Sequence, residues 1–151
     1  GSVRTLISDP ATIDKELQEA DLVIGAVLIP GAAAPKLVRE ETVKKMKKGA
    51  VLVDVAIDQG GCFENSKKTS HDDPTFQVHD TLFYCVANMP GAVANTSTRA
   101  LSSATLPYIR AVANDSLDAA IKRFPGLEGG VMTRGGRLVS EPVRKAFDWE
   151  D

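Results

Sequence analysis

Three short runs of apolar residues constrain the fold of this chain more than any other feature. They cover residues 21–28, 51–56 and 81–87, and each run is almost continuously hydrophobic. Near-continuous apolar strands are typical of parallel sheets with both faces covered. Segments with helical spacing separate the runs, and strands that alternate with helices indicate an α/β fold with a mainly parallel sheet.

The segments around these runs favour helices and loops. Asp9 followed by Pro10 is typical of a helix start, so a helix is predicted over residues 10–19. A long polar loop is expected over residues 58–74, and the sequence becomes mainly helical from Thr96 onward. The other predicted elements are a strand over residues 4–8, helices over 40–48, 101–112, 116–123 and 141–147, and a loop or hairpin over 128–140.

Composition restricts the classes of partner. The chain has 151 residues, 43% of them apolar and 25% charged, and its net charge of −2 gives no electrostatic case for nucleic acid or an anionic membrane. The longest apolar run is far shorter than the roughly 20 residues that a membrane span requires. Two cysteines do not make a disulfide framework, and the two histidines lie too far from them in sequence to indicate zinc. We therefore expect a cytoplasmic protein without a metal.

Each of the three runs ends in an unusual loop, namely "VLIPGAAAP", "IDQGG" and "NMPGA". In a parallel sheet these loops lie on one edge, where ligands bind outside the carboxyl ends of the strands. Asp58 and Asn88 are therefore expected to face one crevice. Glycines in or beside these loops would give the backbone room; they are Gly25, Gly31, Gly60, Gly61 and Gly91.

Each candidate also has a structural interpretation. Asp58 can orient a substrate amine or hold a water molecule, and it can equally be a turn-forming aspartate. Asn88 can bind a ligand amide or cap the following segment. Residues 26–32 can lie against a flat ring or simply end a strand at a Pro-Gly turn.

Four long strings carry a resemblance to a known family. They are "ADLVIGAVLIPGAAAPKLV", "MKKGAVLVDVAIDQGGCFENS", "DPTFQVHDTLFYCVANMPGAV" and "TSTRALSSATLPY". Over residues 4–141 the chain resembles L-alanine dehydrogenase, whose members oxidise L-alanine to pyruvate and ammonium with NAD. The resemblance implies the carboxyl-terminal part of such an enzyme.

The resemblance also implies a division of the chain. Residues 3–95 would be the second half of a Rossmann-type, NAD(P)-binding domain with a parallel sheet. Residues 96–151 would be carboxyl-terminal helices that return to the substrate domain. Members of the family form homo-oligomers, usually hexamers, so a homo-oligomer is expected.

Site roles follow from the matching strings. Asp58 would be the catalytic aspartate, close to the nicotinamide and the substrate amine. The residues expected to line the nicotinamide and its ribose are Val27, Leu28, Ala56, Ile57, Asp58, Val86, Asn88 and Met89. The family's substrate-domain lysine and histidine, its glycine-rich phosphate loop and the acid for the adenosine ribose have no counterpart here, so this fragment is expected to be inactive alone.

Two other functional classes stay open at this point. A non-catalytic truncated domain could act as an oligomerisation or assembly module, because half of a sheet exposes a strand edge and an apolar face. A regulatory nucleotide-binding module is the third class. No G-x-G-x-x-G follows a strand of the sequence, which disfavours this third class.

Overall fold

The computed structural model describes residues 2–30 and 32–147, so Gly31 and the end of the region predicted over 96–151 lie outside the described residues. The chain divides into two compact units. One consists of Gly1–Ile29 and Ala33–Met89 and is called the sheet unit below. The other consists of Pro30–Ala32 and Pro90–Asp151 and is called the helical unit.

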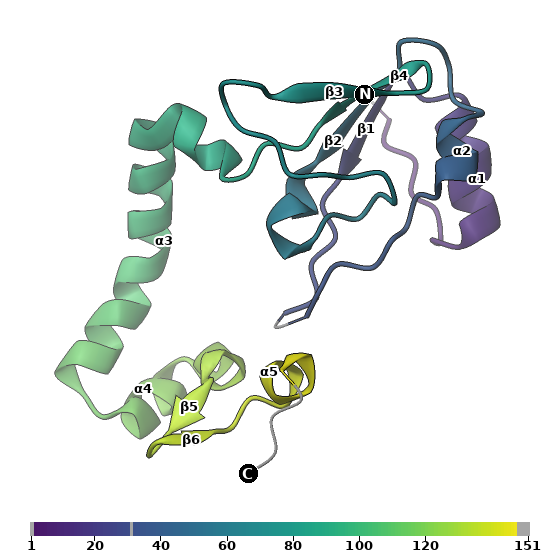
Figure 1. Cartoon of the computed structure of the whole chain (residues 1–151). Coiled ribbons are helices and arrows are strands. Elements are labelled where there is room, and N and C mark those ends of the chain that lie inside the picture. The colour runs from purple at the N-terminus through teal and green to yellow at the C-terminus, as the bar shows by residue number, and fades with distance from the viewer. Residues whose placement is uncertain (1, 31, 148–151) are drawn as a thin grey trace. The chain divides into compact units, whose positions relative to one another are not determined.

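The sheet unit contains a four-stranded sheet in the order β1-β2-β4-β3 (Figure 1). The strands β1 (Leu22–Gly25), β2 (Val51–Asp54) and β4 (Thr81–Tyr84) are parallel. The fourth strand, β3 (Thr75–Val78), is antiparallel to β4. The three apolar runs therefore form parallel neighbours, which confirms the predicted α/β class with a mainly parallel sheet.

The strand register separates the sheet into a covered face and a more exposed face. Val23, Leu52, Phe83 and Phe76 are aligned across the four strands, and Leu52 and Phe83 are fully buried. On the opposite face the β1 residues remain open, with Leu22 59% and Ile24 61% exposed. Two covered faces were predicted, and within the described residues only one face of β1 is covered. The other face remains a large apolar surface.

Helix α1 (Pro10–Gln18) begins as the sequence predicts. The Asp9 carboxylate accepts hydrogen bonds from the backbone N–H groups of Ala11 and Thr12, which satisfies donors that a helix leaves free at its start. Ile13 and Leu17 lie on the face of α1 that packs against the core of the sheet unit. The predicted helix over residues 10–19 is therefore confirmed, with its partly buried face formed by Ile13 and Leu17.

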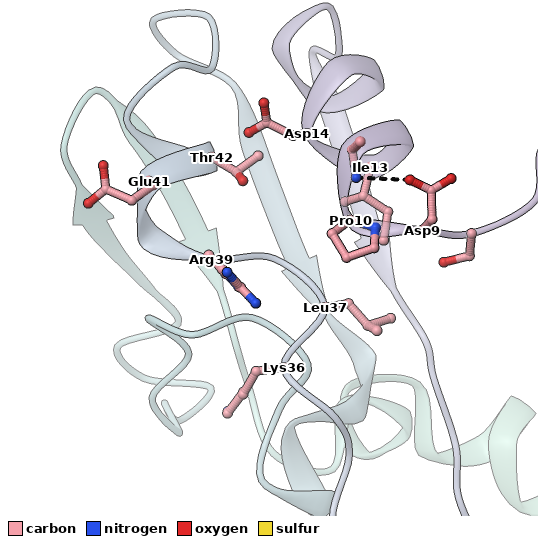
Figure 2. Close-up of a pocket in the computed structure, with 11 residues that line it drawn as sticks. Asp9, Pro10, Ile13, Asp14, Lys36, Leu37, Arg39, Glu41 and Thr42 are labelled. Atoms are coloured by element: carbon pink, nitrogen blue, oxygen red, sulfur yellow. Dashed lines mark hydrogen bonds between the residues drawn. The ribbon is translucent and has the colours of Figure 1, made fainter.

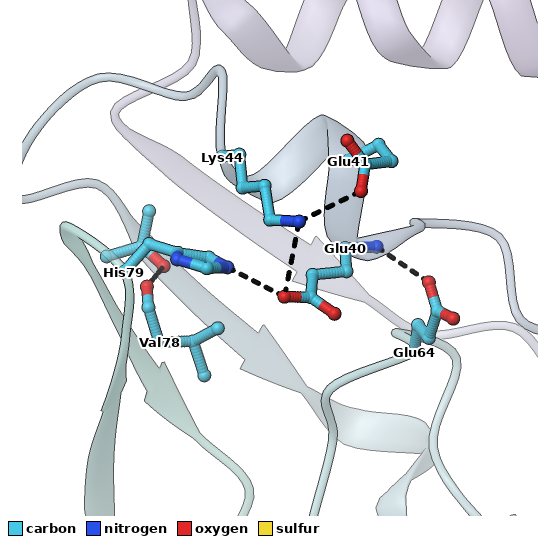
Figure 3. Close-up of polar contacts among 7 residues, drawn as sticks. Glu40, Glu41, Lys44, Glu64, Val78 and His79 are labelled. Carbon is cyan, nitrogen blue, oxygen red and sulfur yellow. Dashed lines mark hydrogen bonds and ion pairs between the residues drawn. The ribbon is translucent and has the colours of Figure 1, made fainter.

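Helix α2 (Glu40–Val43) is shorter than the predicted segment 40–48 and lies beside α1 (Figure 1). Its first backbone N–H, on Glu40, donates to the carboxylate of Glu64 at 2.7 Å. The Nε2 atom of His79, in the β3–β4 turn, lies 3.0 Å from Oε1 of Glu40, and Lys44 pairs with Glu40 and Glu41 (Figure 3). Polar contacts therefore join α2 to both the 58–74 loop and the hairpin.

The helical unit contains one long helix and several short elements. The long helix α3 (Ala94–Asn114) continues through Pro107. The ring centroid of Tyr108, in this helix, lies 5.0 Å from the ring centroid of Phe124. The other elements are α4 (Leu117–Arg123), β5 (Thr133–Arg134), β6 (Arg137–Leu138) and α5 (Glu141–Ala146), with the 3-10 helices η2 (Met89–Val93) and η3 (Pro125–Gly130). Gly135 and Gly136 connect β5 to β6 in a short antiparallel hairpin. A loop and a hairpin were the two alternatives predicted for residues 128–140, and the structure contains the hairpin.

One local prediction was wrong, and one strand was not predicted. Residues 4–8 form no strand, and Ile7 is 89% exposed, because no described strand pairs with this segment. The strand β3 was not predicted at all. Its residues alternate between exposed and half-buried, and the polar loop that precedes it obscured this short pattern.

Candidate functional site

The parallel strands place three loop starts on one edge of the sheet. β1 ends at Gly25 and β2 at Asp54, and these two residues are partners in the strand register. β4 ends one register step earlier, at Tyr84. Asp58 follows β2 in the 3-10 helix η1 (Val55–Gln59), and Asn88 follows β4. Asp58 and Asn88 thus come from neighbouring strands at the edge where α/β sheets bind ligands.

Asp58 and Asn88 contact each other directly. The backbone N–H of Asn88 donates to Oδ2 of Asp58 at 3.3 Å, and the Lys68 ammonium lies 3.8 Å from Oδ1. The Asp58 side chain is 48% exposed, so its carboxylate is open to a ligand. Asn88 has a φ of 52°, a left-handed conformation that asparagine adopts more readily than most residues. His71 completes the cluster, with Nε2 3.3 Å from the carbonyl oxygen of Asn88.

The remaining predicted cofactor residues divide by exposure. Leu28 is 64% exposed just beyond β1, and Val27 and Met89 are half-buried. By contrast, the side chains of Ala56, Ile57 and Val86 are buried. Side chains of the first group can line a ligand, whereas the second group can offer a ligand little besides backbone atoms.

Sequence reasoning assigned no role to Asp54, which lies directly behind this site. Asp54 is fully buried, and its carboxylate accepts hydrogen bonds from the backbone N–H groups of Ala56, Cys62 and Phe63 and from the Ser66 hydroxyl. A buried charge is tolerated only when such partners surround it. A single acid inside an apolar strand was the signal in the sequence.

The Gly60-Gly61 pair explains how the chain leaves the core after β2. Both glycines have left-handed backbones, with φ of 92° and 76°. A Cβ atom on Gly61 would lie 2.7 Å from Oδ2 of Asp54 and from Cβ of Ser66, whereas a Cβ on Gly60 would meet nothing within 4 Å. The turn therefore needs glycine for its conformation at both positions, and for close approach to the carboxylate at Gly61.

The cysteines are buried beside the same carboxylate and are not nucleophiles. Burial, followed by the nearby Asp54 charge, raises the pKa of the Cys62 thiol to about 12. Burial also raises the pKa of Cys85. Because the thiolate is the reactive form, both groups remain protonated and unreactive near neutral pH.

A cavity of about 480 Å³ lies elsewhere, between α1 and residues 36–42 (Figure 2). Its carboxylates already have partners, since Asp9 caps α1 and Asp14 lies 3.3 Å from the Lys45 ammonium and accepts from Gln18. The cavity therefore offers few uncommitted groups. The strand edge with Asp58 is the better candidate, because its carboxylate is 48% exposed.

Within residues 2–30 and 32–147, no group of three or more His, Cys, Asp or Glu side chains could hold a metal ion. The same part of the chain contains no helix with the length and hydrophobicity needed to cross a membrane.

The fold and the edge site define the class of protein. A parallel sheet with a half-exposed acid and apolar side chains at its carboxyl edge is the arrangement of half a Rossmann-type nucleotide-binding domain. A family model described as "Alanine dehydrogenase/PNT, C-terminal domain" matches residues 1–141. The chain belongs to this family, which confirms the resemblance inferred from the sequence and implies a nicotinamide dinucleotide as the class of cofactor.

Individual relatives agree with this assignment. The chain is 55% identical over 148 residues to an alanine dehydrogenase of Mycolicibacterium smegmatis, covering 98% of this chain and 40% of the relative. An alanine dehydrogenase of Mycobacterium tuberculosis is 55% identical over 143 residues, covering 95% of this chain and 38% of the relative. The chain thus spans about 40% of the length of the curated relatives it matches.

Solved structures support the same fold. A structure of L-alanine dehydrogenase matches with a TM-score of 0.72 and 46% identity, covering 93% of this chain and 39% of that one. A transhydrogenase from Sinorhizobium meliloti matches with a TM-score of 0.64 and 24% identity, covering 88% and 36%. The second match shows a shared fold only.

The residues present fit one end of the implied cofactor. The exposed Leu28 and half-buried Val27 and Met89 offer apolar surface suited to a flat nicotinamide ring, and Asp58 and Asn88 offer polar groups beside it. The sequence has no glycine-rich phosphate loop after a strand, so this chain contains no recognisable grip for the pyrophosphate.

Proposed function

We propose that the chain supplies the nicotinamide side of the active site of an NAD-dependent alanine dehydrogenase, which interconverts L-alanine with pyruvate and ammonium. When bound, the cofactor would supply the hydride acceptor for the alpha carbon of the substrate. Val27, Leu28 and Met89 would line the ring. The backbone near Ala56, Ile57 and Val86, together with Asn88, would border the ribose.

In this proposal Asp58 is the catalytic residue. Its carboxylate would face the substrate nitrogen, where positive charge develops as hydride leaves, and would stabilise that charge. It would also orient the water molecule that attacks the resulting iminium carbon. A carboxylate placed within reach of both atoms can accept a proton from that water.

One observation carries the proposal. Asp58 lies at the carboxyl edge of a parallel sheet, half-exposed and 3.3 Å from the backbone N–H that follows the neighbouring strand. Ligands of open α/β sheets bind at this edge. Family membership then supplies the class of cofactor, and the names of the relatives supply the substrate.

The test is steady-state kinetics of the full-length protein that contains these residues. Asp58→Asn keeps the size of the side chain and removes its charge, so we expect kcat for alanine oxidation to fall by about 10²- to 10⁴-fold. The matched control is Asp72→Asn, an exposed acid in the same loop, which should retain turnover within about twofold. Turnover of Asp58→Asn close to that of the unmodified enzyme would refute the proposed role.

We also propose how the two parts of the chain serve the whole protein. Residues 3–95 would complete the nucleotide domain, and residues 96–151 would return to the substrate domain. The 151-residue chain alone should therefore give no alanine-dependent reduction of NAD. Turnover by the isolated chain would contradict this division of labour.

Assembly into a homo-oligomer belongs to the same proposal. Exposed apolar residues on β1 and α3, such as Leu22, Ile24 and Leu101, give the chain surfaces that favour association. A hexamer is the assembly that the family resemblance suggests, and the cytoplasm, where free thiols persist, suits Cys62 and Cys85. Light scattering of the isolated chain should show self-association, and a monodisperse monomer would count against it.

A further inference from the structure

The Asp58 carboxylate has only weak contacts of its own. Its hydrogen bond from Asn88 is long, at 3.3 Å, and the Lys68 ammonium lies 3.8 Å away on an exposed side chain. Exposed ion pairs of this kind contribute little to order. The position of Asp58 is therefore set by the backbone of η1 rather than by partners of its side chain.

That backbone is held by Asp54 from both sides. Oδ1 of Asp54 accepts from the N–H of Ala56 at 3.0 Å, two residues before Asp58. Oδ2 accepts from the N–H of Cys62 at 2.9 Å and from the Ser66 hydroxyl at 2.5 Å, both after Asp58. One buried carboxylate thus fixes the start and the end of the segment that carries the proposed catalytic residue.

Lys36 holds the same turn from outside. Its ammonium donates to the carbonyl oxygens of Gly60 at 2.6 Å and Gly61 at 2.9 Å. Backbone hydrogen bonds from Ala34 to Gln59 and from Leu37 to Cys62 run alongside it. The turn therefore accepts hydrogen bonds from an exposed cation and donates them to a buried anion, and both restrict its backbone.

We propose that Asp54 is a positioning residue for Asp58, acting with Lys36 through the backbone of residues 55–63. This inference rests on the proposed function. Asp54 contacts no reacting group. Its buried charge orders the turn so that the Asp58 carboxylate meets the substrate at a fixed distance and angle, as efficient catalysis requires.

The test is a double-mutant cycle in the full-length protein. Asp54→Asn replaces one acceptor oxygen by an NH₂ group, which then faces N–H or O–H donors. Because a misplacement of about 1 Å can cost 10²-fold, we expect kcat to fall about 10- to 100-fold. In a protein that already carries Asp58→Asn, the same Asp54→Asn change should lower kcat by less than about threefold. The effects of two residues that act as a unit are not additive in free energy.

A control separates positioning from general destabilisation. Val43 is buried in α2, and its apolar side chain is not one of the hydrogen-bond partners of Asp54, so Val43→Ala lowers stability without removing such a partner. At equal loss of Tm, only Asp54→Asn should lower kcat and increase the deuterium isotope effect with alanine labelled at the alpha carbon. Equal losses of kcat in Val43→Ala and Asp54→Asn would overturn the proposal. So would a double variant whose loss of kcat equals the product of the losses from Asp54→Asn and Asp58→Asn.

Two further measurements keep the outcomes distinct. If Asp54→Asn does not fold, two other variants test the same inference. Ser66→Ala removes one hydrogen bond to Asp54, and Lys36→Met removes two hydrogen bonds to the turn. Each should lower kcat in the same direction but less. Both variants at full turnover would overturn the inference.

If Asp58→Asn itself retains turnover, the proposed function fails, and amide hydrogen exchange then tests whether Asp54 orders the turn. Faster exchange of residues 55–63 in Asp54→Asn supports the ordering role, and unchanged exchange refutes it.

Discussion

The two units of the chain differ sharply in how much apolar surface they bury. The sheet unit buries large side chains such as Leu52, Phe63 and Phe83 in one cluster. In the helical unit the buried hydrophobic residues among those described are two alanines, Ala111 and Ala120. A unit with its own core can hold a catalytic side chain in place, whereas a unit without one depends on other surfaces for order.

The difference also explains where the candidate site lies. Every residue proposed for catalysis or cofactor contact belongs to the sheet unit, from Val27 to Met89. The helical unit instead exposes long apolar side chains, with Leu101 66% and Ile109 60% exposed. In the proposed function the sheet unit would carry the catalytic residue, whereas the exposed apolar side chains of the helical unit would provide surfaces for packing.

The largest expected effect comes from removing a core ring of the sheet unit. Phe83 is fully buried between Phe63 and Phe76, so Phe83→Ala should lower the free energy of unfolding by about 3–5 kcal/mol. Leu101→Ala in α3, at a 66% exposed position, should change it by less than about 0.5 kcal/mol. Urea unfolding gives both values, and amide exchange in β2 and α3 assigns each to its unit. Similar losses of free energy of unfolding for Phe83→Ala and Leu101→Ala would show that the two units do not differ in the stability of their packing.

The next effect concerns the turn beneath the site. Gly61→Ala places a methyl group against the Asp54 carboxylate in a left-handed conformation, so it should cost about 1–3 kcal/mol. Gly60→Ala has the same strained φ but open space around it, and should cost about 1 kcal/mol. If urea unfolding gives the two variants equal stability, the close contact between the turn and Asp54 is absent.

A smaller effect tests the helical unit. Tyr108 and Phe124 form an edge-to-face pair with centroids 5.0 Å apart, which should be worth about 0.5–1.5 kcal/mol beyond area burial. The double-mutant cycle Tyr108→Leu with Phe124→Leu measures this coupling by urea unfolding. A coupling near zero would mean that this ring pair contributes nothing to the stability of the helical unit.

The smallest effect is the pH response of α2. The hydrogen bond with His79, followed by the Lys44 charge, lowers the pKa of Glu40. A carboxylate with a lowered pKa stabilises the fold above its unfolded pKa, and this contribution disappears as pH falls through the folded pKa. His79→Asn keeps a residue that tolerates the left-handed turn but shortens its reach, so the Glu40 pKa should rise. An NMR titration of Glu40 that is unchanged in this variant would show that the contact in Figure 3 has no effect.

Much of the fold could be predicted because it depends on local patterns. The three parallel strands and the start of α1 followed from apolar runs and from Asp9-Pro10. The short β3 strand was missed because its pairing with β4 is antiparallel and its residues are half-exposed. Residues 4–8 have a strand-like composition but no partner strand among the described residues, and composition alone does not supply one.

Part of the candidate site could be predicted from local patterns, whereas the part that depends on contacts distant in sequence could not. Asp58 and Asn88 were expected to share one crevice, and their 3.3 Å hydrogen bond brings them together. Their roles in catalysis stay a prediction. Asp54 was overlooked as an interruption of a strand, because its partners Cys62 and Ser66 lie eight and twelve residues later, across a turn whose path the sequence does not specify.

The central claim is that Asp58 faces the reacting atoms. The most direct measurement is a crystal structure of the full-length protein with NADH and pyruvate. We predict that the Asp58 carboxylate lies within hydrogen-bond reach, about 2.6–3.2 Å, of a water molecule beside the carbonyl carbon of pyruvate. A nicotinamide ring bound away from the carboxyl edge of β1, β2 and β4, with Asp58 directed to solvent, would contradict it.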